Sequence, residues 1–338
     1  MKRVLLIFRA PRPAANFSIE ASFATMQAAF ESRGELALAK WTSSFLSLGL
    51  WSRLQGMLEV ARQRADVYHV TGDVHFLSLA LPRSRTVLTI HDVGFLTRGR
   101  TALQRWILKK LWLDLPVRHC SVVTAVSEAT RAEIIRHTGC PPEKVVVVPT
   151  VIPQSLRPAP KAFNEDCPTV LHIGMAPNKN FFRHVEALAG LRCKLRIVGR
   201  LDEKHLEHLR KHAIDYSAAH SLSNEQVRDA YEACDIVLFA STLEGFGMPI
   251  IEANTVERVV VTSALSSMPE IAGLAACLVD PYRVESIREG LLRVMSDSKY
   301  REQLLAAGRE NRSRFTPAAV ANQYREIYAR VSELKSIR

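Results

Sequence analysis

The 338-residue chain lacks any apolar stretch approaching the roughly 20 residues that a membrane-spanning helix requires. Its most signal-like segment is the basic and apolar run Met1–Phe8, which stops at Arg9 and is followed by no small-residue cleavage site. We therefore expect this run to form a first buried strand rather than a signal peptide.

Cysteine is also sparse, and its placement argues against two kinds of structural site. The six cysteines are scattered, with no C-x-x-C pair and no close cysteine–histidine cluster. This spacing fits neither a disulfide framework nor a structural zinc site. A reducing cytoplasm is the expected setting.

What is present is a regular alternation of short Val- and Ile-rich runs with longer helical segments. A length of 338 residues suits two domains of roughly 150 residues each. The short runs do not alternate apolar with polar residues, as expected for parallel strands buried on both faces. Strands are predicted over 4–8, 67–70, 87–90, 122–126, 145–148, 169–173, 195–198, 236–239 and 259–261. Helices are predicted, among others, over 18–31, 101–115, 224–233 and 317–334. This order predicts a doubly wound α/β architecture.

A proline-rich stretch marks the expected boundary between two domains. Four prolines occur from Pro149 to Pro160, and such a segment continues neither a helix nor a central strand. We predict two α/β domains, over residues 1–155 and residues 165–315, with a cleft between them. Residues 316–338 should form a C-terminal helix, capped by Thr316, that crosses back to the first domain.

Two glutamates and two glycines follow one predicted strand of the second domain. The strand ending near Phe239 leads into Glu244-Gly-Phe-Gly-Met-Pro-Ile-Ile-Glu252, where Pro249 suits a first helical position. Loop and helix-start amides at the carboxyl edge of a parallel sheet bind anions, phosphate above all. A carboxylate can bind paired hydroxyls of a sugar or ribose. The pattern predicts a site for a sugar, a diphosphate and a ribose; the alternative is a glycine-rich turn before a surface helix.

This segment resembles the E-x7-E signature of the family 4 glycosyltransferases, which have the GT-B fold. Three neighbouring segments resemble the same family. Residues 171–180 resemble its phosphate-binding turn, residues 221–235 resemble the helix before the signature strand, and residues 263–273 resemble the segment after that strand. The resemblance is close over residues 165–315 and loose over the N-terminal half. It implies two Rossmann-like domains, with residues 1–155 binding the acceptor and residues 165–315 binding the donor. It also implies an enzyme that transfers a sugar from a nucleotide diphosphate with retention of anomeric configuration.

The resemblance also implies roles for individual residues. Glu244 would contact the donor sugar and help orient the diphosphate, and Glu252 would hold the ribose hydroxyls. Lys179 would neutralise the diphosphate as charge builds on the leaving nucleotide. The other donor-binding residues implied are Gly174, Asn180, Arg200, Gly245, Phe246, Gly247 and Met248. No metal or other cofactor is expected, and the sequence has no Asp-x-Asp, the usual metal–diphosphate ligand of the other large glycosyltransferase fold.

The sequence departs from the family pattern in two places. The phosphate turn commonly carries an arginine before its lysine, and Met175 or Ala176 stands there instead. Arg200 is a possible substitute, although a loop arginine is more often solvated. Glu257 and Val259 replace a glycine and a proline; if the turn needs a positive φ, a glutamate there costs about 1 kcal/mol. This second departure should affect stability more than chemistry.

Polar residues also follow two predicted strands of the first half. His91 and Asp92 directly follow the strand 87–90. They resemble the family's His-Asp loop, in which His91 would take part in catalysis by touching the donor sugar or the acceptor. A His-Asp pair that caps a turn is the alternative. Arg9 and Arg12 follow the first strand, where they would bind an acceptor phosphate. Asp92 would be a further contact to the acceptor. The alternative is that both arginines lie in a solvated loop.

Positive charge is concentrated in the first half. Residues 1–155 hold 20 Lys and Arg against 11 Asp and Glu, whereas the remainder holds 25 against 23, within a net charge of +11. Such a half indicates an anionic partner. Residues 98–113 predict a basic helix that places Leu103, Trp106, Ile107 and Leu111 on one face. This helix suits an anionic membrane surface and a lipid-linked acceptor, and an ordinary half-buried helix is the alternative.

Together these features predict a retaining hexosyltransferase. It would move a hexose from a UDP- or GDP-linked donor to a glycan or lipid-linked saccharide in bacterial surface polysaccharide synthesis, either free in the cytoplasm or peripheral at the inner face of the cell membrane. A sugar-nucleotide epimerase of the same fold and a non-catalytic nucleotide-sugar binding protein are the alternatives. No G-x-G-x-x-G follows a predicted strand and no nucleic-acid recognition motif occurs, so neither a dinucleotide oxidoreductase nor a nucleic-acid partner is expected.

Overall fold

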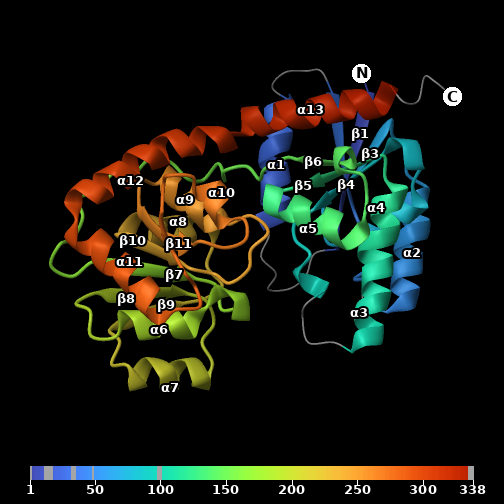
Figure 1. The fold of residues 1–338 in the computed structure, drawn as a ribbon. Coiled ribbons are helices and arrows are strands. Elements are labelled where there is room, and N and C mark those ends of the chain that lie inside the picture. Colours follow the sequence, from blue (N-terminus) through green and yellow to red (C-terminus); the bar gives the residue numbers. More distant parts are fainter. Residues whose placement is uncertain (1, 11–17, 32–35, 48, 97–100, 334–338) are drawn as a thin grey trace. The chain divides into compact units, whose positions relative to one another are not determined.

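The computed structural model describes residues 2–10, 18–31, 36–47, 49–96 and 101–333. The chain divides into two compact units, each considered by itself here (Figure 1). Unit 1 comprises Met1–Val151 and Thr316–Arg338, and unit 2 comprises Ile152–Phe315. The first division falls within the proline-rich stretch, and the C-terminal helix belongs to unit 1.

Unit 1 is built on a six-stranded parallel sheet with the strand order β2-β1-β3-β4-β5-β6. Its strands are β1 (Lys2–Phe8), β2 (Leu36–Thr42), β3 (Val67–Val70), β4 (Thr86–Ile90), β5 (Val122–Ala125) and β6 (Val145–Val147). The central strands β3, β4 and β5 are buried along their whole length. Their lack of alternation follows from this burial on both faces.

Helices surround this sheet, and the C-terminal helix completes its core. They are α1 (Ser18–Glu31), α2 (Leu50–Ala61), α3 (Ala102–Leu108), α4 (Leu115–His119), α5 (Glu128–Thr138) and α13 (Pro317–Glu333), with short 3-10 turns at His75–Ala80 (η1), Arg83–Arg85 (η2), Gly94–Leu96 (η3) and Pro142–Lys144 (η5). Helix α13 packs against α1, with the ring of Tyr324 beside Phe23 and that of Tyr328 beside Phe30. The Tyr328 hydroxyl also bonds the buried His69 ring at 2.7 Å.

The helix expected over 101–115 is interrupted by a π-helical segment, η4 (Lys109–Asp114). Pro116 explains the change, because a proline has no amide to donate to the carbonyl four residues earlier. That carbonyl belongs to Trp112 and accepts a hydrogen bond from the His75 ring at 2.6 Å instead. The predicted helix is therefore present as three successive segments.

Unit 2 repeats the plan with a second six-stranded parallel sheet, of order β12-β11-β10-β7-β8-β9. Its strands are β7 (Thr169–Ile173), β8 (Lys194–Val198), β9 (Tyr216–Ala219), β10 (Ile236–Phe239), β11 (Val259–Ser263) and β12 (Cys277–Val279). Its helices are α6 (Phe181–Leu188), α7 (Glu203–Lys211), α8 (Asn224–Ala233), α9 (Met248–Thr255), α10 (Met268–Ala272), α11 (Val284–Ser296) and α12 (Ser298–Asn311), with 3-10 turns η6 (Pro177–Lys179) and η7 (Arg312–Phe315). Both units are thus doubly wound, as the sequence predicts.

A buried arginine and an exposed lysine hold the end of the proline-rich segment within unit 2. The buried Arg258 donates to the carbonyl of Ala159 at 2.8 Å and to that of Cys234 at 2.9 Å. Lys161 pairs with the buried carboxylate of Asp235 at 2.7 Å. All six cysteines are free thiols. In the described part of the chain, none of the helices has the length and apolar character needed to cross a bilayer.

Candidate functional site

The E-x7-E segment forms the turn from β10 into α9, at the carboxyl edge of the unit 2 sheet. Gly247 precedes the helix with φ +109°, a conformation that side chains on an L-residue strongly disfavour. Helix α9 begins at Met248, so Pro249 lies at its second position rather than its first. The buried Ser267 holds the loop by donating to the carbonyls of Glu244 and Phe246 at 3.0 and 2.8 Å.

This loop presents backbone donors to an incoming anion. Within the described part of the chain, the amides of Phe246, Gly247 and Met248 donate to no protein acceptor. The first amides of a helix have no intrahelical partner, and the helix dipole places partial positive charge there. Phe246 itself is buried, with its ring against Phe315. The side chain anchors the loop while its amide remains available.

A second turn, after β7, lies against this loop. Lys179 ends η6, and its Nζ lies 2.7 Å from Oε1 of Glu244. The side-chain amide of Asn178 donates to the same oxygen at 3.1 Å and to the carbonyl of Leu243 at 2.9 Å. Strands β7 and β10 are neighbours in the sheet, so their carboxyl ends bring Lys179 and Glu244 together. The two residues predicted to act on the diphosphate and the sugar are in direct contact.

Gly174 gives Lys179 the room to lie across this turn. Gly174 has φ +88°, and a Cβ added there would lie 3.2 Å from the Lys179 methylenes. Lys179 also lies with its Nζ 4.7 Å from the centre of the Phe239 ring. The predicted role of Gly174 as a backbone donor to a ligand does not hold, because its amide donates to the carbonyl of Val198 at 2.8 Å. Gly174 instead leaves space for the lysine, which a larger residue would displace.

Asn180 differs from its predicted role. It is buried in the left-handed conformation at φ +61°. Its side-chain amide donates to the carbonyls of Ala240 and Pro281 at 3.0 and 2.7 Å, and its oxygen accepts from Arg183. These bonds occupy the side chain, so Asn180 fixes the turn and the loop beneath the site rather than offering a free group to a ligand.

Glu252 lies one turn into α9, with its carboxylate partly buried. Its Oε2 accepts a hydrogen bond from the hydroxyl of Tyr231, a fully buried residue of α8. Burial raises the pKa of the Glu252 carboxyl, whereas the Tyr231 bond and the charge of Lys179 lower it. Burial and the neighbouring carboxylate also raise the pKa of Tyr231 well above its ordinary value. Among the described residues nothing donates to Oε1 of Glu252, so one oxygen is fixed and the other is available for a hydroxyl.

Tyr231 is therefore a site residue that the sequence did not assign. It occurs in the segment 221–235, which resembles the family, but no spacing rule connects it with Glu252, 21 residues later. The contact depends on the packing of α8 against the sheet. Burial of an aromatic hydroxyl without a partner is unfavourable, and Glu252 provides that partner.

No cation occupies the position of the expected arginine. Met175 packs on Gly199 so closely that a Cβ added to this glycine would lie 2.4 Å from the Met175 Cγ. Arg200 is exposed and makes no hydrogen bond or ion pair with any described residue. Its proposed substitution for the family arginine stays a prediction, and Lys179 is the one cation of the turn 174–180.

Glu257 has the left-handed conformation that the departure from the family pattern implied, with φ +58°. Its carboxylate is only 10% exposed and pairs with Arg309 at 2.9 Å and Arg312 at 3.4 Å. The backbone strain of a non-glycine residue is thereby offset in part by two ion pairs to the end of α12 and to η7. This side chain lies after the last turn of α9, at the opposite end of that helix from Gly247, and links it to α12 and η7.

The predicted residues of the first half gather at the carboxyl edge of the unit 1 sheet. The His91 ring donates from Nε2 to the carbonyl of Thr71 at 2.7 Å, and burial lowers its pKa, so the ring is neutral with an unprotonated Nδ1. Asp92 accepts from the amide of Gly94 at 2.8 Å, the turn-capping contact of the alternative reading. Both descriptions thus hold in part: Asp92 caps a turn, and His91 retains a free acceptor atom.

Arg9 lies in an ion-pair cluster rather than in a solvated loop. Its guanidinium is only 13% exposed, bonds Glu20 at 3.0 Å and also pairs with Asp73. Two carboxylates neutralise its charge, which weakens the prediction that it binds an acceptor phosphate. Asp73, which follows β3, was not singled out from the sequence. Arg12 lies outside the described residues.

The apolar face predicted for the basic helix is exposed. The described part of that helix, from Thr101 onward, leaves Leu103, Trp106, Ile107 and Leu111 between 37% and 66% exposed. Helix α2 exposes a second set, Leu50, Trp51, Leu54 and Leu58. The two segments meet where Arg53 lies over the Trp112 ring at 4.6 Å. Figure 1 labels α2 and α3. Helix α3 has no buried residue, whereas Leu113 and Asp114 of η4 are buried, so the alternative of a half-buried helix holds for η4 and not for α3.

Comparison with known proteins agrees with this geometry. The family model "Glycosyl transferases group 1" matches residues 155–311, and the model "Glycosyltransferase Family 4" matches residues 27–155. The serotype-specific mannosyltransferase WbdA of Escherichia coli is 23% identical over 70% of this chain, which spans only about a third (32%) of WbdA. The O-antigen chain mannosyltransferase B of Escherichia coli is 27% identical over 69% of this chain and 67% of its own length.

Solved structures show the same fold. Sucrose-phosphate synthase from Thermosynechococcus elongatus superposes with a TM-score of 0.79 at 16% identity, covering 98% of this chain and 99% of that one. HepE of Anabaena, in complex with UDP and glucose, superposes with a TM-score of 0.74 at 15% identity, covering 97% and 100%. The fold is the GT-B fold. With its E-x7-E turn at the sheet edge and two family models matching consecutive parts of its sequence, the chain belongs to the family 4 glycosyltransferases.

Proposed function

We propose that this chain is a retaining hexosyltransferase that uses a nucleotide diphosphate sugar. The observation that carries the proposal is the contact of Lys179 with Glu244 beside the unpaired amides of Phe246, Gly247 and Met248. Glu252 lies on the helix that these amides begin. The cation and the three amides suit a diphosphate, Glu244 suits a sugar on one side of it, and Glu252 suits a ribose on the other side.

The chemistry follows from the charges. As the bond between the sugar and the diphosphate breaks, negative charge grows on the leaving phosphate, and the Lys179 ammonium and the helix-start amides stabilise it. In the free protein Lys179 is paired with Glu244. A bound diphosphate competes for the same ammonium, and Glu244 is then released to bind hydroxyls of the transferred sugar. The free oxygen of Glu252 accepts from the ribose hydroxyls.

We propose mannose, from a GDP- or UDP-linked donor, as the first sugar to test. Both relatives described above are named as mannosyltransferases, and one acts by name on an O-antigen chain. The acceptor would be a glycan or lipid-linked saccharide of a bacterial surface polysaccharide. Unit 1 would bind it, with the unprotonated Nδ1 of His91 as an acceptor for a sugar hydroxyl.

The proposal includes a reaction that needs no metal or other cofactor. Lys179 and the amides supply the positive charge that a metal would otherwise bring to the diphosphate. Transfer measured with and without a chelator tests this point. Loss of activity in the chelator, with recovery on adding a divalent cation, would overturn it.

The main experiment measures donor binding by calorimetry and turnover by release of the free nucleotide diphosphate. GDP- and UDP-linked hexoses are compared for the wild type, Glu244→Ala and Glu252→Ala. Glu252→Ala should weaken nucleotide binding by roughly 10- to 100-fold, the value of charge-assisted hydrogen bonds. Glu244→Ala should keep nucleotide binding, because it frees Lys179, and should lower turnover by about 10²- to 10³-fold.

The exposed residue Glu289 on α11 provides a matched control, and Glu289→Ala should behave as the wild type. Binding without turnover in the wild type would favour a nucleotide-sugar binding protein, and conversion of the donor sugar to its epimer would favour an epimerase. If Glu244→Ala and Glu252→Ala both bind and react like the wild type, the donor site is wrongly assigned.

We further propose that the exposed apolar residues of α2 and of the α3–η4 segment bind an anionic membrane at the cytoplasmic side. Trp51 is 79% exposed and Trp106 is 59% exposed. Tryptophan prefers the membrane–water interface, and unit 1 carries most of the net positive charge. A lipid-linked acceptor would be presented at such a surface.

Flotation with vesicles tests this surface. The wild type should float with phosphatidylglycerol vesicles at low salt, and less with phosphatidylcholine. Replacing Trp51 and Trp106 together by serine should abolish flotation. The control Leu274→Ser changes an equally exposed apolar residue of unit 2 and should have no effect. Absence of wild-type flotation, or equal flotation of the double variant, would refute the membrane proposal.

A further inference from the structure

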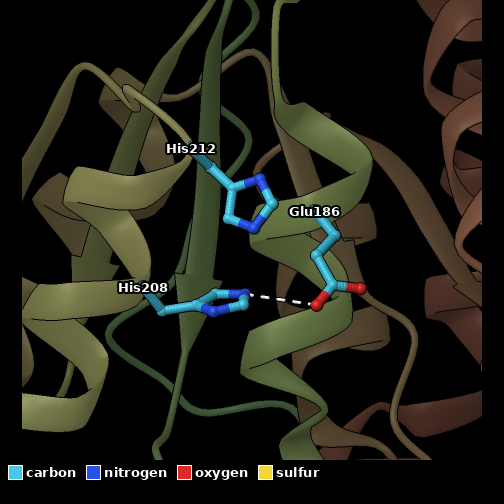
Figure 2. A group of neighbouring side chains, drawn as sticks. All are labelled: Glu186, His208 and His212. Carbon is cyan, nitrogen blue, oxygen red and sulfur yellow. Dashed lines mark ion pairs between the residues drawn. The ribbon is translucent and has the colours of Figure 1, made fainter.

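Two histidines and a glutamate of unit 2 gather away from the turn 174–180 and from the E-x7-E segment. His208 lies near the end of α7, His212 follows directly after that helix, and Glu186 lies in the last turn of α6. Figure 2 shows the three side chains converging from the two neighbouring segments. One ligand atom from each lies within 4.8 Å of the others. The glycosyltransferase function assigns none of them.

The two histidines have the spacing of a helical chelating pair. Residues four apart in a helix lie on one face, one turn above the other, and two such imidazoles can bind one metal ion. The rings of His208 and His212 lie 4.6 Å apart between their centres. A carboxylate from a second element completes the His₂Glu set found in several zinc enzymes.

The spacing of the ligand atoms agrees with this chemistry. With bonds of roughly 2.0–2.1 Å in a tetrahedral arrangement, two ligand atoms on zinc lie about 3.3 Å apart. The Nε2 of His208 lies 3.4 Å from Oε1 of Glu186 (Figure 2). Since all three ligand atoms lie within 4.8 Å of one another, the third has to approach by no more than about 1.5 Å, which is within reach of a change in side-chain torsion.

His212 supplies an independent observation. Its Nε2 is covered from solvent and has no hydrogen-bond partner among the described residues. Covered polar atoms are nearly always bonded, so an unpaired one requires an explanation. Figure 2 shows that a ring nitrogen of His212 points toward the space beside Glu186 and His208.

We propose that Glu186, His208 and His212 form a binding site for one Zn²⁺ or a similar divalent transition-metal ion. Imidazole and carboxylate ligands suit such ions, whereas Mg²⁺ and Ca²⁺ prefer oxygen ligands alone. Water occupies the fourth position. The ion links α6 to α7 and stabilises unit 2.

The site has one competitor within the protein. The Nε2 of His208 also bonds the carbonyl of Phe182 at 3.2 Å. Metal binding requires this nitrogen to lose its proton and to exchange that bond for a bond to the ion. The affinity is therefore lower than that of a fully prepared structural zinc site.

The site is separate from the transfer reaction. Glu186 lies six residues after Asn180, which corresponds to roughly 9 Å along α6. Occupation of the site should raise the thermal stability and leave donor affinity unchanged. The proposal is thus independent of the proposed function, since its test needs no substrate.

The experiment uses the full chain without a histidine tag, after treatment with a chelator. Calorimetry with Zn²⁺ should show one site per chain, Zn²⁺ should raise the melting temperature, and Co²⁺ should give the intense visible absorption of a tetrahedral site. His212→Ala should lose all three signals. This variant should fold normally, because the deleted Nε2 makes no hydrogen bond with a described residue.

The second variant, Glu186→Gln, retains the shape of the side chain and removes the charge of the ligand. This variant should weaken Zn²⁺ binding at least tenfold. The control His220→Ala removes an exposed histidine of the same unit and should bind as the wild type. Equal Zn²⁺ binding by the wild type and His212→Ala would overturn the proposal. So would Zn²⁺ binding without a gain in melting temperature, or no binding by the wild type.

Discussion

Replacing Tyr231 by phenylalanine tests whether the buried hydroxyl prepares Glu252 for the nucleotide. The hydroxyl is the one donor to the Glu252 carboxylate among the described residues, and Tyr231 is fully buried. A hydrogen bond to a charged group contributes about 1.5–3 kcal/mol, and its removal leaves Oε2 of a partly buried carboxylate unpaired. We expect the free energy of unfolding of unit 2 to fall by about that amount.

The functional effect of Tyr231→Phe has the same origin. The lost bond lowers the pKa of Glu252 in the wild type, so its removal raises that pKa further and disfavours the ionised form that binds ribose. Nucleotide affinity should fall by up to about tenfold, equivalent to 1.4 kcal/mol. Turnover at saturating donor should change little, because Lys179 and Glu244 are not touched.

Urea denaturation followed by circular dichroism, and calorimetry with UDP and GDP, measure the two effects. Tyr324→Phe is the control, since that buried hydroxyl bonds Thr89 in unit 1. It should lower stability without changing nucleotide affinity. Unchanged nucleotide affinity in Tyr231→Phe would refute the reasoning that this tyrosine positions Glu252.

Three further predictions follow from backbone strain and burial. At the positive φ of residue 257, Glu257→Gly should be about 1 kcal/mol more stable than Glu257→Ala, because both lose the ion pairs and only alanine retains the strain; equal stabilities in urea denaturation would contradict this. Gly247→Ala places a Cβ 3.1 Å from Ile250 at φ +109°, so it should lower stability by more than 1 kcal/mol and weaken donor binding in calorimetry; wild-type behaviour would contradict the need for glycine. Burial raises the pKa of Glu252 in the folded chain above its ordinary 4.5, so the folded chain binds this proton more tightly than the unfolded chain. The free energy of unfolding, relative to that of Glu252→Gln, should therefore increase as the pH falls from about 7 toward 4.5. A free energy of unfolding that changes with pH in the same way for both proteins would show that the shift is absent.

The strands that the sequence missed all lie at edges of the sheets, although one edge strand, β6, was predicted. Runs such as Val67–Val70 and Ile236–Phe239 are central, buried on both faces and therefore continuously apolar. The missed strands, β2, β9 and β12, are all edge strands. An edge strand has fewer neighbours, and β9 is largely exposed, so its sequence Tyr216–Ala219 lacks the apolar pattern that identifies a central strand.

The site shows a similar division. Glu244 and Glu252 were predicted from the local pattern of a loop and a helix start, and Lys179 from the resemblance to the family. Tyr231 and Ser267, which contact the E-x7-E segment, belong to other elements. Their positions depend on which helices pack beside α9, and this packing cannot be deduced from local periodicity. The sequence therefore identifies the loop and helix residues of the candidate site better than the residues that position them.

The replacement of the family arginine also has a structural explanation. Met175 fills the space over Gly199 and packs against the core of unit 2. An arginine there would have to leave this apolar contact to reach a diphosphate, so the two roles exclude each other at this position. The turn 174–180 consequently supplies one cation, and Glu244 neutralises it when no donor is bound. Because backbone amides carry no net charge, the proposed donor complex would draw most of its remaining affinity for a diphosphate from oriented dipoles of the loop and of α9. The proposal therefore implies that the conformation of Gly247 is more important for donor binding here than in a relative that has two cations.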